Sequence, residues 1–223
     1  MSDNIRSIEE YVSKAWEENT SYRQYTEEDY FVINGEPVFG VLDLWRYAYS
    51  QLNNMRPQIA EFLVAQALEI KKAENSSYWT AYDMSYRNKR VEVKETSYVH
   101  PWNKKKISDT RTFSIAPSKN EYWFGNVPED IQLEEYSRQS DVYVFCLNTD
   151  KNIESPSPLN LDYWEFYVVP TFKINRYAVA NGNPNQKTIG LNAVKKLSLG
   201  CADFNGLKAK IDEAINMPDR DNK

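Results

Sequence analysis

The stretch that decides the fold runs from Trp79 to Trp102 and reads WTAYDMSYRNKRVEVKETSYVHPW. It contains two short segments in which polar and apolar residues alternate, as they do in half-buried strands. Asn88 and Lys89 lie between the two segments and predict a two-residue turn. The stretch is therefore expected to form a β-hairpin.

The two faces of this predicted hairpin differ in chemistry. With Asn88 and Lys89 as the turn, Asp83 lies directly opposite Lys94, and Glu92 lies diagonally from Asp83 on the same face. The opposite face is apolar and suits a core, with Met84 opposite Val93 and Tyr86 opposite Val91. One face therefore packs, while the other gathers two carboxylates and an ammonium. A loop one residue longer would break this register.

These residues carry a resemblance to a known family. Asp83, followed after eight residues by Glu92-Val93-Lys94, resembles the D…(D/E)-x-K signature of the PD-(D/E)XK, or restriction-endonuclease-like, nuclease superfamily. EVKETSYVHPWNKKKIS resembles the run EVK-(S/T)-(S/A)-x-Y-x-Q-x-W-x-x-K-x-x-S of a bacterial group within it. FGVLDLWRYAYSQLNNMRPQIAEFLVAQAL resembles that group's helical lead-in, with its D-x-W, N-x-x-R and A-E-F-x-V-A elements. With the later segments RQSDVYVFCLN and WEFYVVPT, the resemblance extends roughly from Val38 to Leu197.

The chain departs from this pattern at three places. Glu95 stands where a Ser is usual, His100 stands where a Gln is usual, and Ala81-Tyr82 precede Asp83 without a Pro. These departures concern the finer substrate contacts more than the metal site.

The resemblance implies an α/β fold with a restriction-endonuclease-like core, in which helices flank a mixed central β-sheet. Residues 37–223 would form this nuclease domain, and residues 1–36 would form an N-terminal extension. Apolar residues at helical spacing predict an amphipathic helix over residues 5–19, and Asn34-Gly35 predicts a hairpin turn after it. The extension is acidic, which fits a solvated face or, as the alternative, an arm for a homodimer.

The resemblance also implies a metal-dependent active site. Asp83 and Glu92 would supply the hard oxygen ligands that Mg²⁺ prefers, with Mn²⁺ as a substitute, and the backbone carbonyl of Val93 would complete the set. Lys94 would position and help deprotonate the attacking water and offset charge in the transition state. Glu61, on the helical lead-in, would hold a second metal or a metal-bound water.

Each of these assignments has a purely structural alternative. Glu61 is the only charged residue in the apolar run Ile59–Leu68, so it must be paired or solvated, and Arg56 is a candidate partner. The hairpin could equally lie on the surface with an Asp83–Lys94 ion pair worth at most about 1 kcal/mol.

The distribution of charge favours a phosphate-binding region beside the hairpin. The net charge is -5, which argues against a protein that coats nucleic acid by bulk charge. The segment from Arg87 to Arg111, however, carries eight basic residues against three acidic ones. Nucleic-acid contacts are therefore expected in this segment, from Lys104, Lys105, Lys106, Trp102 and His100.

Composition also excludes other kinds of site. The chain has one histidine, so two-histidine metal sites and zinc clusters lack ligands. Its seven glycines form no G-x-x-x-x-G-K phosphate loop, and its two cysteines suggest no disulfide framework. No apolar run reaches the roughly 20 residues that span a bilayer, and the N-terminus does not resemble a signal peptide. We expect a cytoplasmic protein without membrane contacts.

Further elements follow from periodicity. Helices are predicted from Leu42 to Asn54, after Pro57, near Glu129–Arg138, over Leu191–Leu197 and over Asp203–Asn216. DVYVFCLN and WEFYVVPT predict inner strands because they are apolar on both faces, and a further strand is predicted at Thr112–Ile115.

Three functions are compatible with these patterns. The first is a metal-dependent DNA endonuclease that leaves 5′-phosphate and 3′-hydroxyl ends. The second is a nucleic-acid-binding protein on the same fold that cleaves weakly or not at all. The third is an acidic interaction protein whose hairpin charges only keep it solvated.

Overall fold

The computed structural model describes residues 25–70, 82–100, 107, 110–119 and 135–219. Its centre is a five-stranded sheet in the order β3-β4-β6-β7-β9. Strands β4 and β6 are parallel and all other neighbours are antiparallel, so the sheet is mixed. The strands are β3 (Met84–Tyr86), β4 (Lys89–Ser97), β6 (Val142–Asn148), β7 (Trp164–Pro170) and β9 (Cys201–Ala202). The predicted α/β class with a mixed central sheet is confirmed.

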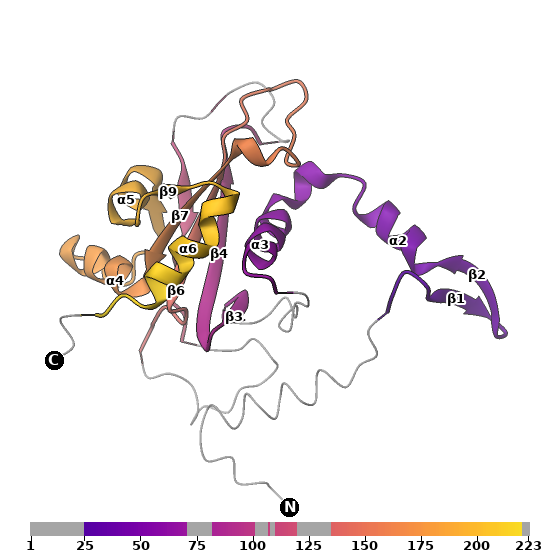
Figure 1. The fold of residues 1–223 in the computed structure, drawn as a ribbon, viewed down its shortest axis with the longest axis horizontal. Coiled ribbons are helices and arrows are strands. Elements are labelled where there is room, and N and C mark those ends of the chain that lie inside the picture. The colour runs from indigo at the N-terminus through magenta and orange to yellow at the C-terminus, as the bar shows by residue number, and fades with distance from the viewer. Residues whose placement is uncertain (1–24, 71–81, 101–106, 108–109, 120–134, 220–223) are drawn as a thin grey trace, which may run out of the picture.

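Helices cover both faces of this sheet, because its inner strands are apolar on both sides. All seven residues of β6 are buried, as expected for a strand that alternates its side chains between two covered faces. One face packs on α3 (Arg56–Ala67) and α6 (Phe204–Ile215). The other packs on α4 (Thr171–Ala180), α5 (Leu191–Leu197) and a small sheet made of β5 (Thr112–Ser114) and β8 (Thr188–Gly190). Figure 1 shows α3 on one side of the sheet and α4 and α5 on the other.

The β3–β4 hairpin forms, but its predicted register is wrong by two residues. Met84 pairs with Val91 and Tyr86 with Lys89, so the turn residues are Arg87 and Asn88. Both have positive φ, 50° and 60°, as a type I′ turn requires. Because the side-chain period of a strand is two, a shift of two residues changes the partners but keeps every side chain on its face.

Several helix predictions need correction. The predicted helix over Leu42–Asn54 is two elements, α2 (Val41–Ala48) and the 3₁₀ turn η1 (Leu52–Met55). The sequence reading missed α4 and the 3₁₀ turn η3 (Leu161–Tyr163). The described end of the predicted helix near Glu129–Arg138 is extended and bridges Ser137 to Ser118. α3 is less buried than its composition suggests, since Phe62 is 58% exposed.

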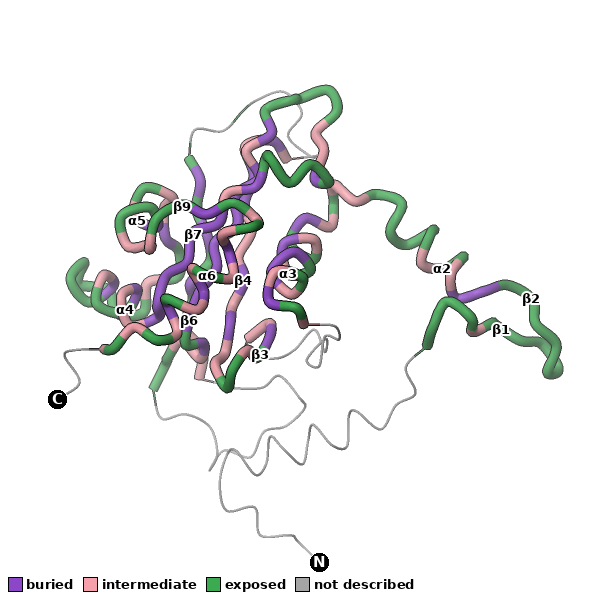
Figure 2. Tube along the Cα trace, viewed as in Figure 1, coloured by how far each residue is buried: buried purple, intermediate pink, exposed green. Residues whose placement is uncertain are grey.

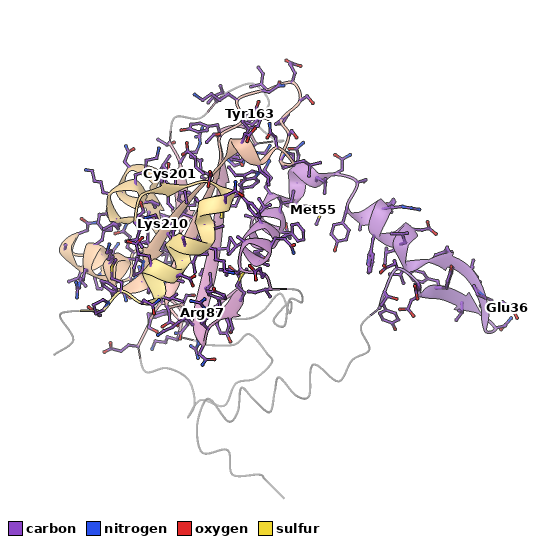
Figure 3. The ribbon with its side chains drawn as sticks, in the orientation of Figure 1. Glu36, Met55, Arg87, Tyr163, Cys201 and Lys210 are labelled. Carbon is purple, nitrogen blue, oxygen red and sulfur yellow. The ribbon has the colours of Figure 1, made fainter. Side chains whose placement is uncertain are left out.

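The described chain begins with an arm that stands away from the sheet. This arm, residues 25–49, contains β1 (Tyr30–Ile33), β2 (Glu36–Gly40) and α2, and the predicted Asn34-Gly35 turn joins its strands. Figure 2 shows the arm almost entirely exposed, and Figure 3 places Glu36 at its tip. Its exposed large apolar side chains are Tyr25, Tyr30, Phe31, Val32, Ile33, Val38, Phe39, Leu44, Tyr47 and Tyr49.

Two predictions about the N-terminal extension are not tested by the described residues. The predicted helix over residues 5–19 lies outside the described residues, and the boundary between residues 36 and 37 stays a prediction. Among the residues that the structure describes, no helix is long and apolar enough to cross a membrane.

Candidate active site

Four predicted site residues gather where β3 begins beside β4. Glu92 and Lys94 are in β4, Asp83 directly precedes β3, and Glu61 comes from α3. The backbone N–H of Asp83 donates to the carbonyl of Val91 at 3.1 Å. Val91 is already the partner of Met84, so the regular ladder ends at Met84 and Asp83 also lies beside Val91. The predicted pairing of Asp83 with Lys94 is therefore not part of the ladder.

Lys94 forms its ion pair with Glu92 in a largely enclosed place. The Lys94 ammonium contacts Glu92 Oε1, and the two side chains are only 28% and 13% exposed. The hydroxyl of Ser140 donates to Glu92 Oε2 at 3.4 Å. The alternative of a solvated surface hairpin held by an Asp83–Lys94 pair therefore does not describe these residues.

The backbone of β4 contributes to the same place. The Val93 N–H donates to Asp83 Oδ2 at 2.6 Å. The Asp83 carboxylate thus accepts the hydrogen bond that a backbone carbonyl would accept if β3 began earlier. The N–H and C=O of one strand residue point to the same side of the strand. The carbonyl of Val93 therefore points to the same edge of β4 as its N–H, the edge beside which Asp83 lies.

Buried negative charge dominates the electrostatics of this cluster. Burial and the neighbouring Asp83 carboxylate raise the pKa of Glu92 to about 7, against the lowering effect of Lys94. Burial, followed by the charge of Asp83, raises the pKa of Glu61 to about 7 as well. Burial also raises the pKa of Asp83. Burial lowers the pKa of Lys94, but the charges of Glu92, Asp83 and Glu61 outweigh it and the net shift is upward.

This charge balance fits a divalent cation. When all groups are ionised, three carboxylates face one ammonium, which leaves an excess of two negative charges. Asp83, Glu92 and the Val93 carbonyl form a set of hard oxygen donors of the kind that holds Mg²⁺ together with waters and phosphate. Among the described residues, no three His, Cys, Asp or Glu side chains are arranged as a metal-binding group. The residues that could hold a cation are therefore those of the prediction, Asp83, Glu92 and the Val93 carbonyl, with Glu61 as the additional carboxylate.

Of the other predicted residues, the structure describes only His100. Trp102, Lys104, Lys105 and Lys106 lie outside the described residues. His100 is half-buried beyond the end of β4, and burial, followed by the charges of Arg56 and Arg111, lowers its pKa. A neutral His100 would offer a phosphate a hydrogen bond and no charge.

Arg56, the predicted alternative partner of Glu61, forms its hydrogen bonds with other residues. Arg56 is 2% exposed and donates to Asn53 at 2.8 Å and to Asn148 at 3.4 Å. It therefore fixes the start of α3 to the end of β6. The charges that act on Glu61 are those of Asp83, Lys94 and Glu92.

Sequence reasoning missed Ser140, which contacts Glu92, and Tyr143, whose buried hydroxyl senses the charges of Glu92 and Asp83. Ser140 lies two residues before β6 and Tyr143 is the second residue of β6, which runs parallel to β4. No local pattern marks them, because only the pairing of β4 with β6 brings them to the site.

No protein-family model matches this sequence, and no curated protein was found to be similar to it.

The raised pKa values predict how stability depends on pH without metal. Glu61 and Glu92 hold protons up to about pH 7 in the folded chain, whereas the unfolded values are 4.5. The stability that these protons provide is present below the unfolded values and is lost as the pH rises through about 7. The slope is at most about 1.4 kcal/mol per pH unit for each group, and less for the partly exposed Glu61.

We therefore expect the melting temperature in EDTA to fall between about pH 5 and about pH 8, and Mg²⁺ to reduce that fall. Glu61→Gln should flatten the EDTA curve, and the matched exposed variant Glu154→Gln should not. A melting temperature that rises over this range in EDTA would contradict the buried-carboxylate description.

Proposed function

We propose that this protein is a metal-dependent DNA endonuclease with a restriction-endonuclease-like core. The observation that carries the proposal is the meeting of Asp83, Glu92, Lys94 and Glu61, from three separate parts of the chain, in one enclosed cluster. Clustering carboxylates away from water costs folding free energy. Such clusters are typical of functional sites, which supports a catalytic role for these residues. The mixed sheet with a parallel β4–β6 pair and a preceding α3 is compatible with the proposed core.

Asp83, Glu92 and the Val93 carbonyl would hold Mg²⁺. When bound, the ion supplies Lewis-acid stabilisation of the charge that develops on the phosphate oxygens. The hydrogen bond from the Val93 N–H fixes the orientation of the Asp83 carboxylate, and Ser140 does the same for Glu92. Both carboxylates are therefore held in place before a substrate arrives, which spares the reaction the cost of ordering them.

Lys94 and Glu61 would handle the attacking water. The Lys94 ammonium lies against Glu92, where it can orient a water and offset charge on the pentacovalent transition state. Glu61, with a pKa of about 7, can accept a proton near neutral pH and return it to solvent. The enclosed position strengthens these interactions relative to water.

One assay tests the proposed function directly. Supercoiled plasmid, with and without base modification, is incubated with the chain in Mg²⁺, Mn²⁺, Ca²⁺ or EDTA. We expect nicked or linear products in Mg²⁺ or Mn²⁺ and none in EDTA, and we expect ends that DNA ligase rejoins because they carry 5′-phosphate. DNA binding in Ca²⁺ without cleavage in any metal would favour the second function, a binding protein on the same fold.

The basic segment yields a separate prediction about binding. Replacing Lys104, Lys105 and Lys106 together with Ala should weaken DNA binding and flatten its dependence on salt by roughly two to three in the slope of log K against log salt. Filter binding or fluorescence anisotropy at several salt concentrations would measure this. A matched triple change at Lys195, Lys196 and Lys210, which lie on α5 and α6, should leave the slope unchanged. Equal slopes for wild type and the first variant would remove this segment from the phosphate contacts.

A further inference from the structure

The arm, residues 25–49, presents more apolar surface than an isolated element can keep in water. Its two strands pair with each other, and within the described chain β2 packs against α2 of the same arm. A two-stranded hairpin without a covered face is marginally stable at best. Its strand residues Phe31, Ile33 and Phe39 are nevertheless 40%, 64% and 52% exposed. We therefore expect another protein surface to bury these side chains.

The root of the arm is fixed to the rest of the molecule. The Asn53 side chain in η1 donates to the carbonyl of Pro156 at 2.9 Å, and Arg56 holds the same turn through Asn53 Oδ1. Figure 3 shows Met55 at this junction and Glu36 at the distant tip. The arm therefore projects from an anchored base, which suits an element that reaches a partner.

Both faces of the hairpin are apolar. Phe31 and Phe39 lie on one face with ring centroids 4.7 Å apart, and Ile33, two residues from Phe31, lies on that face too. Tyr30 and Val32 point to the opposite face and are each 58% exposed. The amphipathic helix predicted over residues 5–19 has one apolar face, so it could cover one side of the hairpin and leave the other.

The exposed area of the arm matches what a stable dimer needs. Ten large side chains of the arm are between 40% and 83% exposed. With aromatic side chains of 150–250 Å² each, these contribute roughly 1,000 Å² per arm. A specific interface of ordinary size buries about 800 Å² per partner, so the arm alone supplies enough.

We propose that this arm is a dimerisation element that packs against the arm of a second copy of this chain. The two arms pack around each other with Phe31, Ile33 and Phe39 at the centre, so that apolar side chains of both hairpin faces and of α2 are covered, and a two-fold axis relates the two copies. Edge-to-edge pairing is disfavoured on β2, because Pro37 has no N–H to donate and a bulge interrupts the ladder between Phe31 and Val32. The inference is independent of the proposed nuclease activity.

Light scattering after size exclusion, with the full chain at about 50 µM, tests this proposal. We expect the wild type to have twice the chain mass. Phe39→Ser and Ile33→Asp should each weaken the dimer by about 30-fold or more, as loss of a central anchor does. The matched control Phe62→Ser changes an equally exposed phenylalanine on α3 and should leave the dimer intact. Circular dichroism should show the same fold for all variants.

Three results would overturn the proposal. A monomeric wild type would leave residues 1–24 of the same chain as the cover of the hairpin. A dimer that survives both arm variants would place the interface elsewhere. A dimer that Phe62→Ser dissociates as strongly as Phe39→Ser would implicate the α3 surface.

Discussion

Lys94→Ala is expected to lower the rate of DNA cleavage by on the order of 10² to 10³ while DNA binding largely survives. The ammonium lies against Glu92 and is under the influence of the charges of Asp83 and Glu61, so its removal takes away the cation that pairs with Glu92. Contacts to the phosphate backbone would come from other residues. The loss should therefore appear in the chemical step.

Folding of this variant should be affected less than catalysis. Lys94 lowers the pKa of Glu92, against the larger effect of burial. Without Lys94 the pKa of Glu92 should therefore rise further, and the carboxyl should keep a proton at neutral pH. A neutral carboxyl is cheaper to bury than an unpaired carboxylate. We expect a melting temperature within a few degrees of wild type at about pH 6, where the carboxyl is protonated.

Lys89→Ala is the matched control for Lys94→Ala. Lys89 lies on the same strand and pairs with Asp141 at 3.0 Å, outside the cluster. Melting temperature, DNA affinity in Ca²⁺ and cleavage in Mg²⁺ should be measured for both variants. Normal cleavage by a folded Lys94→Ala protein would remove Lys94 from the mechanism and would favour a different chemistry.

The hairpin illustrates how far local sequence rules reach. Alternation predicted correctly that Val91 and Val93 share the core face of β4 and that Glu92 and Lys94 share the other, because that property depends only on the period of the strand. The turn was misplaced because Asn88 was assigned to the first turn position, whereas it occupies the second. Arg87 takes the first position with a positive φ, and its guanidinium pairs with Asp212 of α6 at 2.9 Å. A contact with a residue so distant in sequence cannot be seen in the hairpin itself.

The missed helix α4 is a different kind of failure. Its buried residues Thr171, Ile174 and Ala178 follow helical spacing, so the signal was present. It was hidden by the apolar strand β7, which ends at Pro170 where α4 begins. The spacing after that proline, taken by itself, would have predicted the helix.

The site was only partly accessible from sequence. Glu92 and Lys94 follow from alternation along one strand, but the approach of Glu61 on α3 rested on the family resemblance. Ser140 reaches Glu92 only because β6 pairs in parallel with β4, a long-range choice that no local pattern specifies. The raised pKa values likewise depend on burial, which the packing of the whole domain decides.

Asp83→Asn is expected to abolish measurable metal binding at the site and to lower cleavage by on the order of 10³, since a Lewis acid contributes several kcal/mol to such a reaction. The change removes one charge of the donor set and preserves its shape. Asp83 Oδ2 accepts a hydrogen bond from the Val93 N–H, and the amide oxygen of Asn can accept the same bond. The hairpin should therefore keep its register, and the effect should be one of charge.

Removing that charge should also stabilise the metal-free chain. Asp83 is among the causes that raise the pKa of both Glu61 and Glu92, so Asp83→Asn should lower both values and raise the melting temperature in EDTA above about pH 7. Calorimetric titration with Mg²⁺ or Ca²⁺ measures the lost affinity. Glu95→Gln is the control, because Glu95 is a partly buried carboxyl of β4 that accepts from Ser97 and is influenced by the charge of Arg56. Undiminished metal affinity in Asp83→Asn, or an equal loss in Glu95→Gln, would show that the cation binds through other groups.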